Sequence, residues 1–300
     1  MIKIGSRGSK LALWQANWVA GKILARYPKE LVPITIITTT GDRFAGKFTD
    51  SSSGKGMFVK EIEEALMRGE IDLAVHSMKD LPTELPEGLF VPVIPPREDA
   101  RDALLTKVED MTLENLPKGA CIGTGSPRRG AQLKYYRQDL AIVPIRGNVD
   151  TRLRKLREQD LAAIILALAG LRRLGLEGQI SDLIPFQVML PAVAQGALGL
   201  EIRSDDFATQ ETMSFLHDPK TAACVHAERA FLKALGGGCQ VPIAAHATVE
   251  RATIHLQGCV TDLEGRRQIS GSQSCSVDQA VDLGTRLAAT LLQQGADKLI

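Results

Sequence analysis

Short apolar segments alternate with helical segments over the first two thirds of the chain, and this alternation limits the possible folds most strongly. In the first series, strands are expected at residues 2–4, 32–39 and 72–75, and helices at 10–27, with Ser9 as the N-cap, and at 57–68. A second series follows a Pro-rich stretch at 91–96, with strands at 120–123, 142–145 and 162–167. Its helices are one that opens at Ser126-Pro127, with a cap and a proline in the first turn, and another at 149–158. Strands that alternate with helices indicate parallel βαβ units. The sequence therefore predicts an α/β fold with two doubly wound domains.

The remainder of the chain has a different pattern. From about residue 218 it indicates a helix, three strands and a final helix, which is typical of a smaller α+β domain. A chain of 300 residues is also too long for one core of ordinary size. The predicted domains are residues 1–96 with about 196–216, residues 97–195, and residues 217–300.

Composition excludes several classes of protein. The hydrophobic content of 44% and charged content of 24% are those of a globular protein, and aromatic residues, at 4%, are too few for a single-strand nucleic-acid surface. The longest apolar run, 161–171, is too short to cross a bilayer, and no signal peptide is recognised at the start. Five scattered cysteines without CxxC spacing argue against disulfides and structural zinc. We expect a cytoplasmic protein that binds neither nucleic acid nor membranes.

Basic residues concentrate in one region of a nearly neutral chain. Residues 121–180 hold eleven Lys or Arg against five Asp or Glu, whereas the whole chain has a net charge of +1. Ser126-Pro127-Arg128-Arg129 opens a helix, where backbone N–H groups and guanidiniums both favour an anion. A solvated helix face explains Arg154, Lys155 and Arg157. For arginines at strand ends, binding of an anionic ligand is the favoured interpretation.

Several polar segments follow directly after expected strands. They are Gly5-Ser6-Arg7, His76 to Asp80, Gly123 to Arg129 and Arg146-Gly147-Asn148. Ligands of doubly wound sheets bind at the carboxyl ends of the strands. Two similar domains with facing strand ends would form one cleft.

Asp80 is a candidate catalytic residue. It lies beside Lys79 just past an apolar strand, where a carboxylate stays ionised and can stabilise a cation or transfer a proton. Taken alone, however, a cap of the turn before Leu81-Pro82 is the better interpretation. The five histidines lack HExxH or other metal spacing, and no metal is expected.

Cys239 lies in Gly236-Gly237-Gly238-Cys239-Gln240-Val241-Pro242, after a helical run at 221–235. The glycines should end the helix and leave the thiol on bare backbone. A reactive cysteine and an incidental cysteine in a glycine-rich turn are equally compatible with this motif. Residues 41–56 are polar, Gly/Ser-rich and without periodicity, and indicate a loop.

Nine motifs together resemble the hydroxymethylbilane synthase, or porphobilinogen deaminase, family. They are LALWQA (11–16), GKGMFVKE (54–61), HSMKDLP (76–82), IGTGSPRR (122–129), IRGNVDTRL (145–153), LALAGLRRLG (166–175), AVAQGALG (192–199), AERAFL (227–232) and GGGCQVPI (236–243). The match runs in order along nearly the whole chain.

The resemblance implies a cytoplasmic, monomeric transferase of tetrapyrrole biosynthesis that takes porphobilinogen as its small-molecule substrate. The family condenses four porphobilinogen molecules head to tail, releases ammonia at each step and hydrolyses the product to linear hydroxymethylbilane. Its primer is a dipyrromethane cofactor held by a thioether, here at Cys239. Its essential aspartate corresponds to Asp80, thought to stabilise the cationic azafulvene left by ammonia loss.

The resemblance also implies the binding residues. Those near the cofactor are Lys79, Thr124, Ser126, Arg128, Arg129, Arg146 and Gly147, and those for the substrate are Arg7, Lys55, Arg152, Arg173 and Gln195. The arginines would bind acetate and propionate side chains, and the loop at 41–56 would be the active-site lid.

The chain departs from the family in details. Gly125 stands where many members carry Ser, Thr40 where some carry Arg, and the triple glycine replaces a residue followed by two glycines. Two other classes of function stay open from the residues: a non-catalytic, two-lobed anion-binding protein and, less favoured, a thiol-redox enzyme. Neither consumes porphobilinogen.

Overall fold

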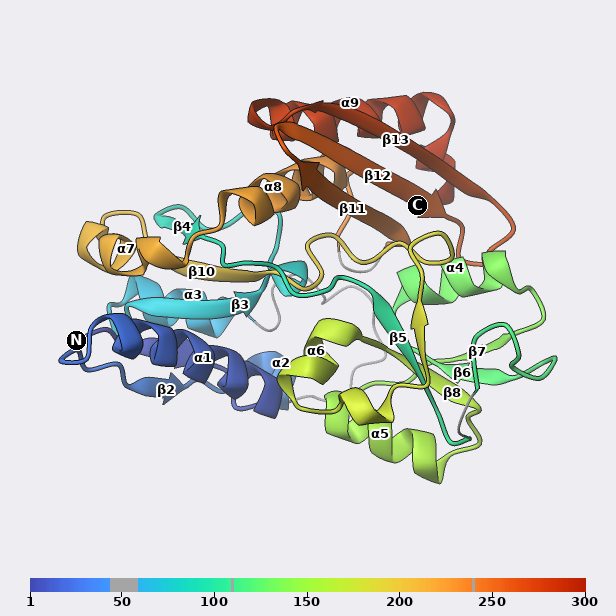
Figure 1. The fold of residues 1–300 in the computed structure, drawn as a ribbon, viewed down its shortest axis with the longest axis horizontal. Coiled ribbons are helices and arrows are strands. Elements are labelled where there is room, and N and C mark those ends of the chain that lie inside the picture. The colour runs from blue at the N-terminus through green and yellow to red at the C-terminus, as the bar shows by residue number, and fades with distance from the viewer. Residues whose placement is uncertain (44–58, 109–110, 239–240) are drawn as a thin grey trace. The chain divides into compact units, whose positions relative to one another are not determined.

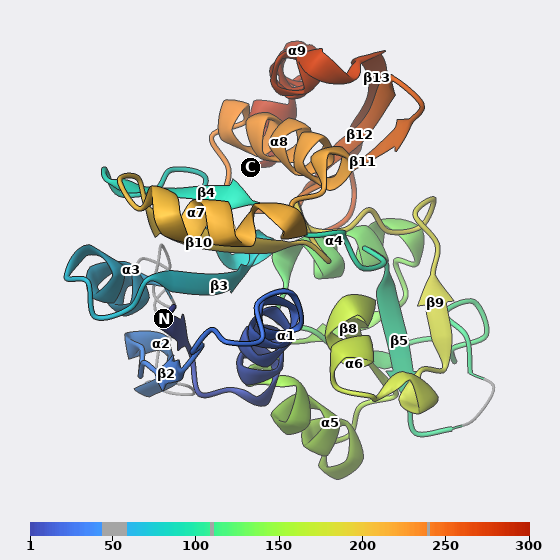
Figure 2. The ribbon, with the colours of Figure 1, turned by 60° about the vertical axis from the view of Figure 1, so that its left-hand side comes forward.

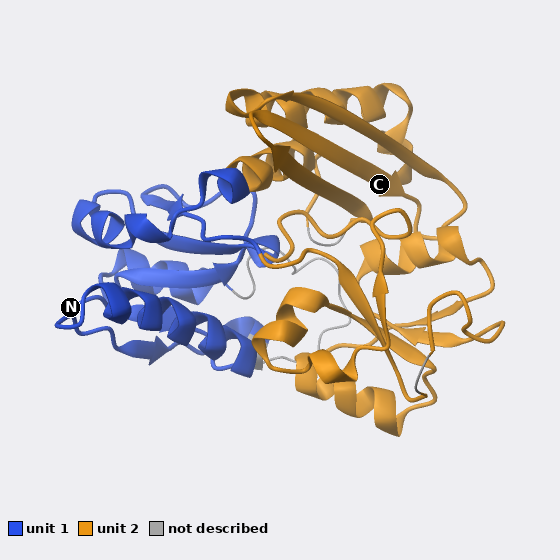
Figure 3. Cartoon of the chain, viewed as in Figure 1, with its two compact units in different colours: residues 1–97, 197–222 blue, residues 98–196, 223–300 orange. Residues whose placement is uncertain are grey.

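The computed structural model describes residues 1–43, 59–108, 111–238 and 241–300. In this part of the chain there are three β-sheets with helices packed on them (Figure 1). The chain forms two compact units, residues 1–97 with 197–222 and residues 98–196 with 223–300 (Figure 3). No helix of the described residues has the length and apolar character needed to cross a membrane.

Unit 1 contains a five-stranded sheet. Its strands are β1 (Ile4–Ser6), β2 (Ile34–Ile36), β3 (Leu73–Ser77), β4 (Leu89–Val93) and β10 (Leu198–Arg203), in the order β2-β1-β3-β10-β4. The first three pair in parallel, as predicted, whereas β10 is antiparallel to both β3 and β4.

Helices cover both faces of this sheet. Val19 and Ile23 of α1 (Lys10–Arg26) pack with Leu73, while Leu66 of α3 (Lys60–Met67) packs with Ala74 on the opposite face. The predicted cap of α1 is confirmed, since the Ser9 hydroxyl accepts the Ala12 N–H at 3.3 Å. The shorter helices are α2 (Thr40–Arg43), η2 (Met78–Asp80), α7 (Phe207–Met213) and η4 (Ser214–Leu216).

Unit 2 contains a second five-stranded sheet with the same arrangement. Its strands are β5 (Asp102–Thr106), β6 (Cys121–Gly123), β7 (Ala141–Val143), β8 (Ala163–Ala167) and β9 (Asp182–Ile184), in the order β7-β6-β8-β5-β9. β6, β7 and β8 are parallel, and β5 is antiparallel to its neighbours. The prediction of two doubly wound sheets is therefore confirmed, with one reversed strand in each.

The helices of this sheet again lie on both faces. Leu133 of α4 (Pro127–Tyr136) packs with Ile122 and Ile165, whereas α5 (Val149–Glu158) and α6 (Leu168–Arg173) pack on the face that carries Ile164. A short turn of helix, η3 (Glu177–Gln179), precedes β9. The observed bounds of α5 are those predicted.

The C-terminal part of the chain forms the predicted three-stranded sheet. Its elements are α8 (Pro219–Ala234), β11 (Ile243–Glu250), β12 (Thr253–Thr261), β13 (Gln268–Ser276), η5 (Val277–Gln279), α9 (Ala280–Gln293) and η6 (Ala296–Leu299). Phe231 of α8 lies over Gly258, and Leu287 of α9 lies over the paired Gly271, so both helices cover one face (Figure 2). On the other face Ala244 and Cys259 pack with Leu190.

Some element boundaries differ from prediction. The first strand is Ile4–Ser6 rather than 2–4, because Ile4 to Ser6 are the residues paired with β2. Residues 40–43 form the short helix α2 instead of opening the loop expected at 41–56. The rest of that loop, including Lys55, lies outside the described residues, as do Cys239 and Gln240.

Candidate active site

Asp80 ends the 3-10 turn η2, directly after the parallel strand β3. The preceding Met78 N–H donates to the Ala197 carbonyl at 3.0 Å, which ties the turn to the start of β10. Asp80 itself is exposed, and its carboxylate makes no hydrogen bond or ion pair to any described residue. The interpretation of Asp80 as a cap would require such a bond, so an available carboxylate is the better description. Lys79 is half-buried.

His76, in the strand leading to Asp80, belongs to a buried polar cluster. Its Nε2 lies 2.8 Å from Oε2 of Glu201 in β10, and both side chains are buried. Glu63 of α3 lies close enough to both side chains for their charges to change its pKa. Burial, together with the Glu201 carboxylate, raises the pKa of Glu63, and His76 opposes this shift. Glu63 Oε1 and Glu201 Oε1 are buried without a hydrogen-bond partner in the described part of the chain.

Arg128 and Arg129, at the start of α4, are both buried against Asp102. Arg128 Nη2 lies 2.7 Å from one oxygen of Asp102, and Arg129 donates from Nε (3.1 Å) and Nη2 (2.7 Å) to the other. Arg128 also donates to the Leu190 carbonyl and Arg129 to the Ile165 carbonyl. Each arginine is only 4% exposed. The sequence predicted two ligand-facing cations, but the structure gives them a shared internal partner.

Asp102 is the important residue that sequence reasoning missed. Burial by itself would raise the pKa of Asp102, but the Arg128 and Arg129 guanidiniums outweigh it and hold that pKa well below its usual value. Burial also lowers the pKa of Arg128, and Asp102 opposes the change. A charged residue at the head of the apolar run Asp102-Ala103-Leu104-Leu105 was the available signal.

Gln195 completes this cluster. Its Nε2 donates to Asp102 Oδ1 and to the Ala100 carbonyl, both at 2.8 Å, and the side chain is buried. The next residue, Gly196, accepts from Arg173 Nη2 at 2.7 Å. Burial lowers the pKa of Arg173 to about 10, which leaves it charged at neutral pH. The structure therefore connects Arg128, Arg129 and Gln195 through Asp102, and Arg173 through the adjacent Gly196.

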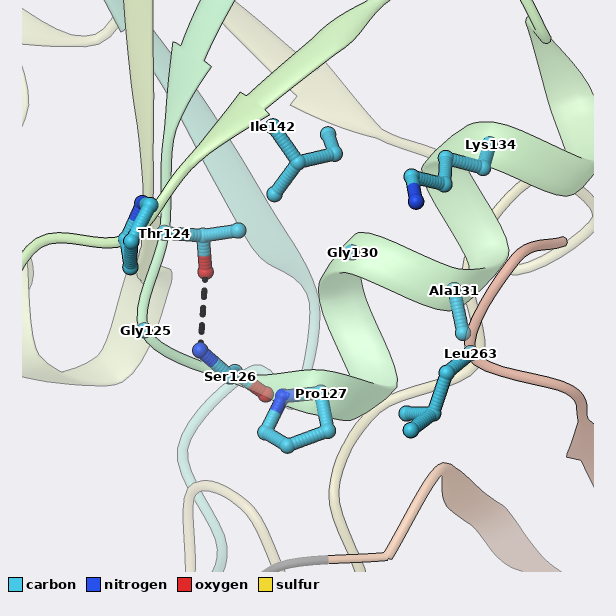
Figure 4. Close-up of a pocket in the computed structure, with 10 residues that line it drawn as sticks. Thr124, Gly125, Ser126, Pro127, Gly130, Ala131, Lys134, Ile142 and Leu263 are labelled. Atoms are coloured by element: carbon cyan, nitrogen blue, oxygen red, sulfur yellow. Dashed lines mark hydrogen bonds between the residues drawn. The ribbon is translucent and has the colours of Figure 1, made fainter.

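The turn Thr124-Gly125-Ser126 lies between β6 and α4. The Ser126 N–H donates to Thr124 Oγ1 at 3.2 Å (Figure 4). The Ser126 hydroxyl caps α4 by accepting the Arg129 N–H at 3.4 Å. These residues line a hollow of about 300 Å³ whose opposite wall includes Lys134 and Leu263 (Figure 4). Lys134 Nζ lies 3.1 Å from Glu264. The turn offers hydroxyl and backbone donors at a helix N-terminus.

Arg146 and Arg152 lie at the neighbouring strand end, after β7. Gly147 has a positive φ of 120°, and its carbonyl accepts from Arg152 Nε at 2.8 Å. Asn148 caps α5 by accepting the Thr151 N–H at 2.9 Å. Arg146 is exposed and Arg152 half-buried. In unit 1, Arg7 follows β1 and is also half-buried.

The helix that leads to Cys239 ends as predicted. The Gly236 N–H donates to the Lys233 carbonyl (2.9 Å) and the Gly237 N–H to the Leu232 carbonyl (3.0 Å), and Gly236 has a φ of 68°. This pattern is a Schellman cap. A Cβ on Gly237 would lie 2.4 Å from Ile243 Cδ1, whereas Gly238 has open space. Gly236 is therefore favoured by its positive φ, and Gly237 by the lack of space for a Cβ. Cys239 itself lies outside the described residues.

Within the described ranges, no group of three His, Cys, Asp or Glu side chains could hold a metal ion. The fold and these residues define an α/β protein with basic and hydroxyl side chains at its strand ends and a glycine-bordered cysteine in its C-terminal third. Comparison with known proteins makes the assignment specific. The family model "Porphobilinogen deaminase, dipyromethane cofactor binding domain" matches residues 2–211, and "Porphobilinogen deaminase, C-terminal domain" matches residues 222–293. The chain belongs to the porphobilinogen deaminase family.

Curated relatives agree over the full length. The porphobilinogen deaminase of Syntrophotalea carbinolica is 52% identical over 299 residues, covering 100% of this chain and 95% of the relative. That of Geobacter metallireducens is 50% identical and covers 100% and 93%. These findings confirm the resemblance, the dipyrromethane cofactor, and the predicted hydroxymethylbilane synthase function, a transferase activity of tetrapyrrole biosynthesis. The non-catalytic anion-binding protein and the thiol-redox enzyme are set aside.

Solved structures of low sequence similarity also match. A putative methionine-binding lipoprotein from Bacillus subtilis has a TM-score of 0.44 at 12% identity, covering 73% of this chain and 91% of that one. A nutrient binding protein from Burkholderia cenocepacia bound to methionine has a TM-score of 0.44 at 11% identity, covering 71% and 90%.

Proposed function

We propose that Asp80 is the catalytic carboxylate and that Cys239 carries the dipyrromethane through a thioether. The observation that carries the first assignment is the exposed carboxylate of Asp80, which has no bond to any described residue at the end of strand β3. A negative charge in this position can stabilise the positive charge that develops on a pyrrole as ammonia leaves porphobilinogen. The Schellman cap before Gly238 supports the second assignment, because it directs the chain into the cysteine segment without a shielding side chain.

The residues present fit a polycarboxylate group. Arg146 is exposed, Arg7 and Arg152 are half-buried, and the turn at Thr124 and Ser126 adds hydroxyl and backbone N–H donors. Guanidiniums and helix N-termini are suited to carboxylate ligands. We assign cofactor binding to Lys79, Thr124, Ser126, Arg128, Arg129, Arg146 and Gly147, and substrate binding to Arg7, Lys55, Arg152, Arg173 and Gln195.

The two buried arginines that bind Asp102 differ in how many of their donors are used. Arg129 uses Nε, Nη1 and Nη2 on Asp102 and Ile165, whereas Arg128 Nε has no hydrogen-bond partner in the described part of the chain. Arg128 therefore retains one buried donor that the described residues do not satisfy, whereas Nε, Nη1 and Nη2 of Arg129 are all bonded within the fold. When bound, the dipyrromethane supplies the primer to which pyrroles are added. The chain's own contribution is to bind carboxylates and to place Asp80.

We also propose that the enzyme acts as a monomer in the cytoplasm, without nucleic-acid or membrane partners. The scattered cysteines support a reducing compartment. The three-domain division at 1–96 with 196–216, 97–195 and 217–300 is likewise proposed. It is supported by the three sheets, each of which falls within one of these ranges.

The attachment of the cofactor can be tested by intact mass. Freshly purified wild-type protein should exceed the mass of the bare chain by one dipyrromethane, and Cys239→Ser should not, because the hydroxyl forms no thioether. Cys275→Ser, at a partly exposed cysteine, serves as the control and should retain the surplus. If Cys239→Ser carried the same surplus as the wild type, Cys239 would not be the attachment residue.

The role of Asp80 can be tested by turnover. Asp80→Ala should fold, bind porphobilinogen and lose about 100-fold or more in kcat, the size typical of removing one group that stabilises transition-state charge. Asp205→Ala, which removes another exposed aspartate of unit 1, should retain normal turnover. Near-normal kcat in Asp80→Ala would exclude Asp80 from the mechanism.

A further inference from the structure

Glu228 of α8 is a fully buried carboxylate that the proposed reaction does not use. Its Oε2 accepts the Ala194 N–H at 2.6 Å, and its Oε1 accepts the Ala247 N–H at 2.7 Å. A buried carboxylate is costly unless it is hydrogen-bonded, and here both oxygens accept from the backbone of other segments. Glu228 thus ties α8 to β11 and to the segment that precedes β10.

Ala194 has an unusual backbone conformation. Its φ is +59°, and in the described part of the chain Arg251 is the other non-glycine residue with a positive φ. A residue with a Cβ adopts this conformation only when its surroundings hold it there. The hydrogen bond from the Ala194 N–H to Glu228 acts directly on the strained residue. Glu228 is therefore positioned to stabilise this turn.

The two residues after Ala194 belong to the hydrogen-bond network that holds the predicted binding arginines. Gln195 Nε2 donates to Asp102 Oδ1, the same oxygen that accepts from Arg129 Nε and Nη2. The Gly196 carbonyl accepts from Arg173 Nη2. A change in the Ala194 backbone would move both contacts at once, because one residue's φ and ψ set the direction of the chain that follows.

We propose that Glu228 is a positioning residue that fixes the arrangement of Arg128, Arg129 and Arg173 through the strained turn at Ala194. Glu228 acts from the helix that leads to Cys239, so one carboxylate sets the geometry of the carboxylate-binding arginines from the C-terminal domain. The inference rests on the proposed binding role of these arginines.

The test compares Glu228→Gln, Ala194→Gly and the double variant. Glutamine keeps the shape but replaces one acceptor oxygen with an NH₂ group, so one backbone N–H loses its partner. Glycine adopts a positive φ without strain, and it should hold the turn without help from Glu228. Ala194→Gly alone should resemble the wild type. Glu250→Gln, at an exposed glutamate of β11, is the matched control and should also resemble it.

Two measurements are made on each protein. The first is the ¹H–¹⁵N spectrum of the arginine Nε–H groups, which reports Arg129 Nε on Asp102 whether or not the enzyme turns over. The second is kcat and KM for porphobilinogen. We expect Glu228→Gln to shift the resonances of Arg128, Arg129 and Arg173 and to raise KM about tenfold, roughly the effect of 1.4 kcal/mol. The double variant should restore the wild-type arginine resonances and the wild-type KM.

Unchanged arginine resonances in Glu228→Gln, or shifted resonances that Ala194→Gly does not restore, would overturn the proposal. A lower unfolding midpoint with normal spectrum and kinetics would also overturn it, because that is the result of a purely structural role. If Glu228→Gln does not fold, the double variant is compared with Ala194→Gly, and the proposal requires their spectra to agree. If the wild type did not turn over porphobilinogen, this would instead count against the proposed function. The arginine spectra could still be interpreted, because they do not depend on turnover.

Discussion

At the scale of single residues, Asp102 accepts hydrogen bonds from Arg128, Arg129 and Gln195 although it is fully buried. A buried ion pair gains little over apolar packing, but losing one partner leaves the other charge uncompensated. Two arginines depend on this one carboxylate. Asp102 therefore controls both the local stability and the orientation of the guanidiniums.

Asp102→Asn should lower the free energy of unfolding by roughly 3–5 kcal/mol, because two buried guanidiniums would lose their counter-charge while the side-chain shape is kept. Urea denaturation at pH 7 measures this. The control is Asp99→Asn, which breaks the partly exposed pair with Arg101 and should cost about 1 kcal/mol or less. Equal losses in the two variants would contradict a special role for Asp102.

The loss of stability caused by Asp102→Asn should depend on pH. Because the pKa of Asp102 is lowered on folding, its contribution is complete above the ordinary carboxyl pKa of about 4 and is lost as pH falls below it. The stability difference between wild type and Asp102→Asn should therefore shrink between pH 7 and pH 3. A difference that stayed constant over this range would show that the charge of Asp102 does not matter.

At the scale of elements, the turn between β6 and α4 depends on Gly125. A Cβ at this position would lie 2.5 Å from the Ile145 carbonyl oxygen, a backbone atom that cannot move without displacing the chain after β7. In this chain the turn therefore lies closer to Ile145 than a side chain at position 125 would allow.

Gly125→Ala should destabilise the protein by about 1–3 kcal/mol, as expected for overpacking against backbone. Thermal unfolding is the measurement. Gly178→Ala is the control, because a Cβ there meets no atom within 4 Å and its φ is not positive, so its midpoint should hardly change. If Gly125→Ala and Gly178→Ala had the same unfolding midpoint, the turn would have room for a side chain.

At the scale of the whole molecule, each five-stranded sheet contains one antiparallel strand next to its edge. In unit 1 this strand is β10, which pairs with both β3 and β4 and arrives after about 100 residues of unit 2. The core residues Leu200 and Ile202 come from β10. Unit 1 is consequently discontinuous in sequence.

A fragment of residues 1–97 should not fold, because β3 and β4 would lack the strand between them. Joining residues 1–97 to 197–222 through a short glycine-serine linker should restore folding. The linker can be short, since the Glu98 N–H donates to the Gly196 carbonyl at 3.3 Å. Cooperative thermal unfolding followed by circular dichroism distinguishes the two. Cooperative unfolding of 1–97 alone would contradict the assignment of β10 as an essential inner strand.

Local features of the fold were predictable from the sequence. The caps at Ser9 and Ser126, the helix at 149–158 and the glycine stop after α8 were each predicted and are each observed. The polar segments after β1, β3, β6 and β7 also follow from periodicity, so the position of Asp80 at a strand end was accessible. These features depend on hydrogen bonds and side-chain patterns within a few residues, which a sequence displays directly.

Only the tertiary structure decided the rest. Asp102 meets Arg128 across 26 positions and Gln195 across 93, and Glu228 meets Ala194 across 34. The reversed strands β5 and β10 also depend on how distant segments pair. By itself the sequence determined the three parallel strands of each five-stranded sheet, most of the helices that cover them, the family and the candidate chemistry, because these are written in local patterns and motifs; the strands β4, β5, β9 and β10 were not predicted. Which buried charges neutralise one another was decided by packing, since that depends on chain segments meeting far from their neighbours in sequence.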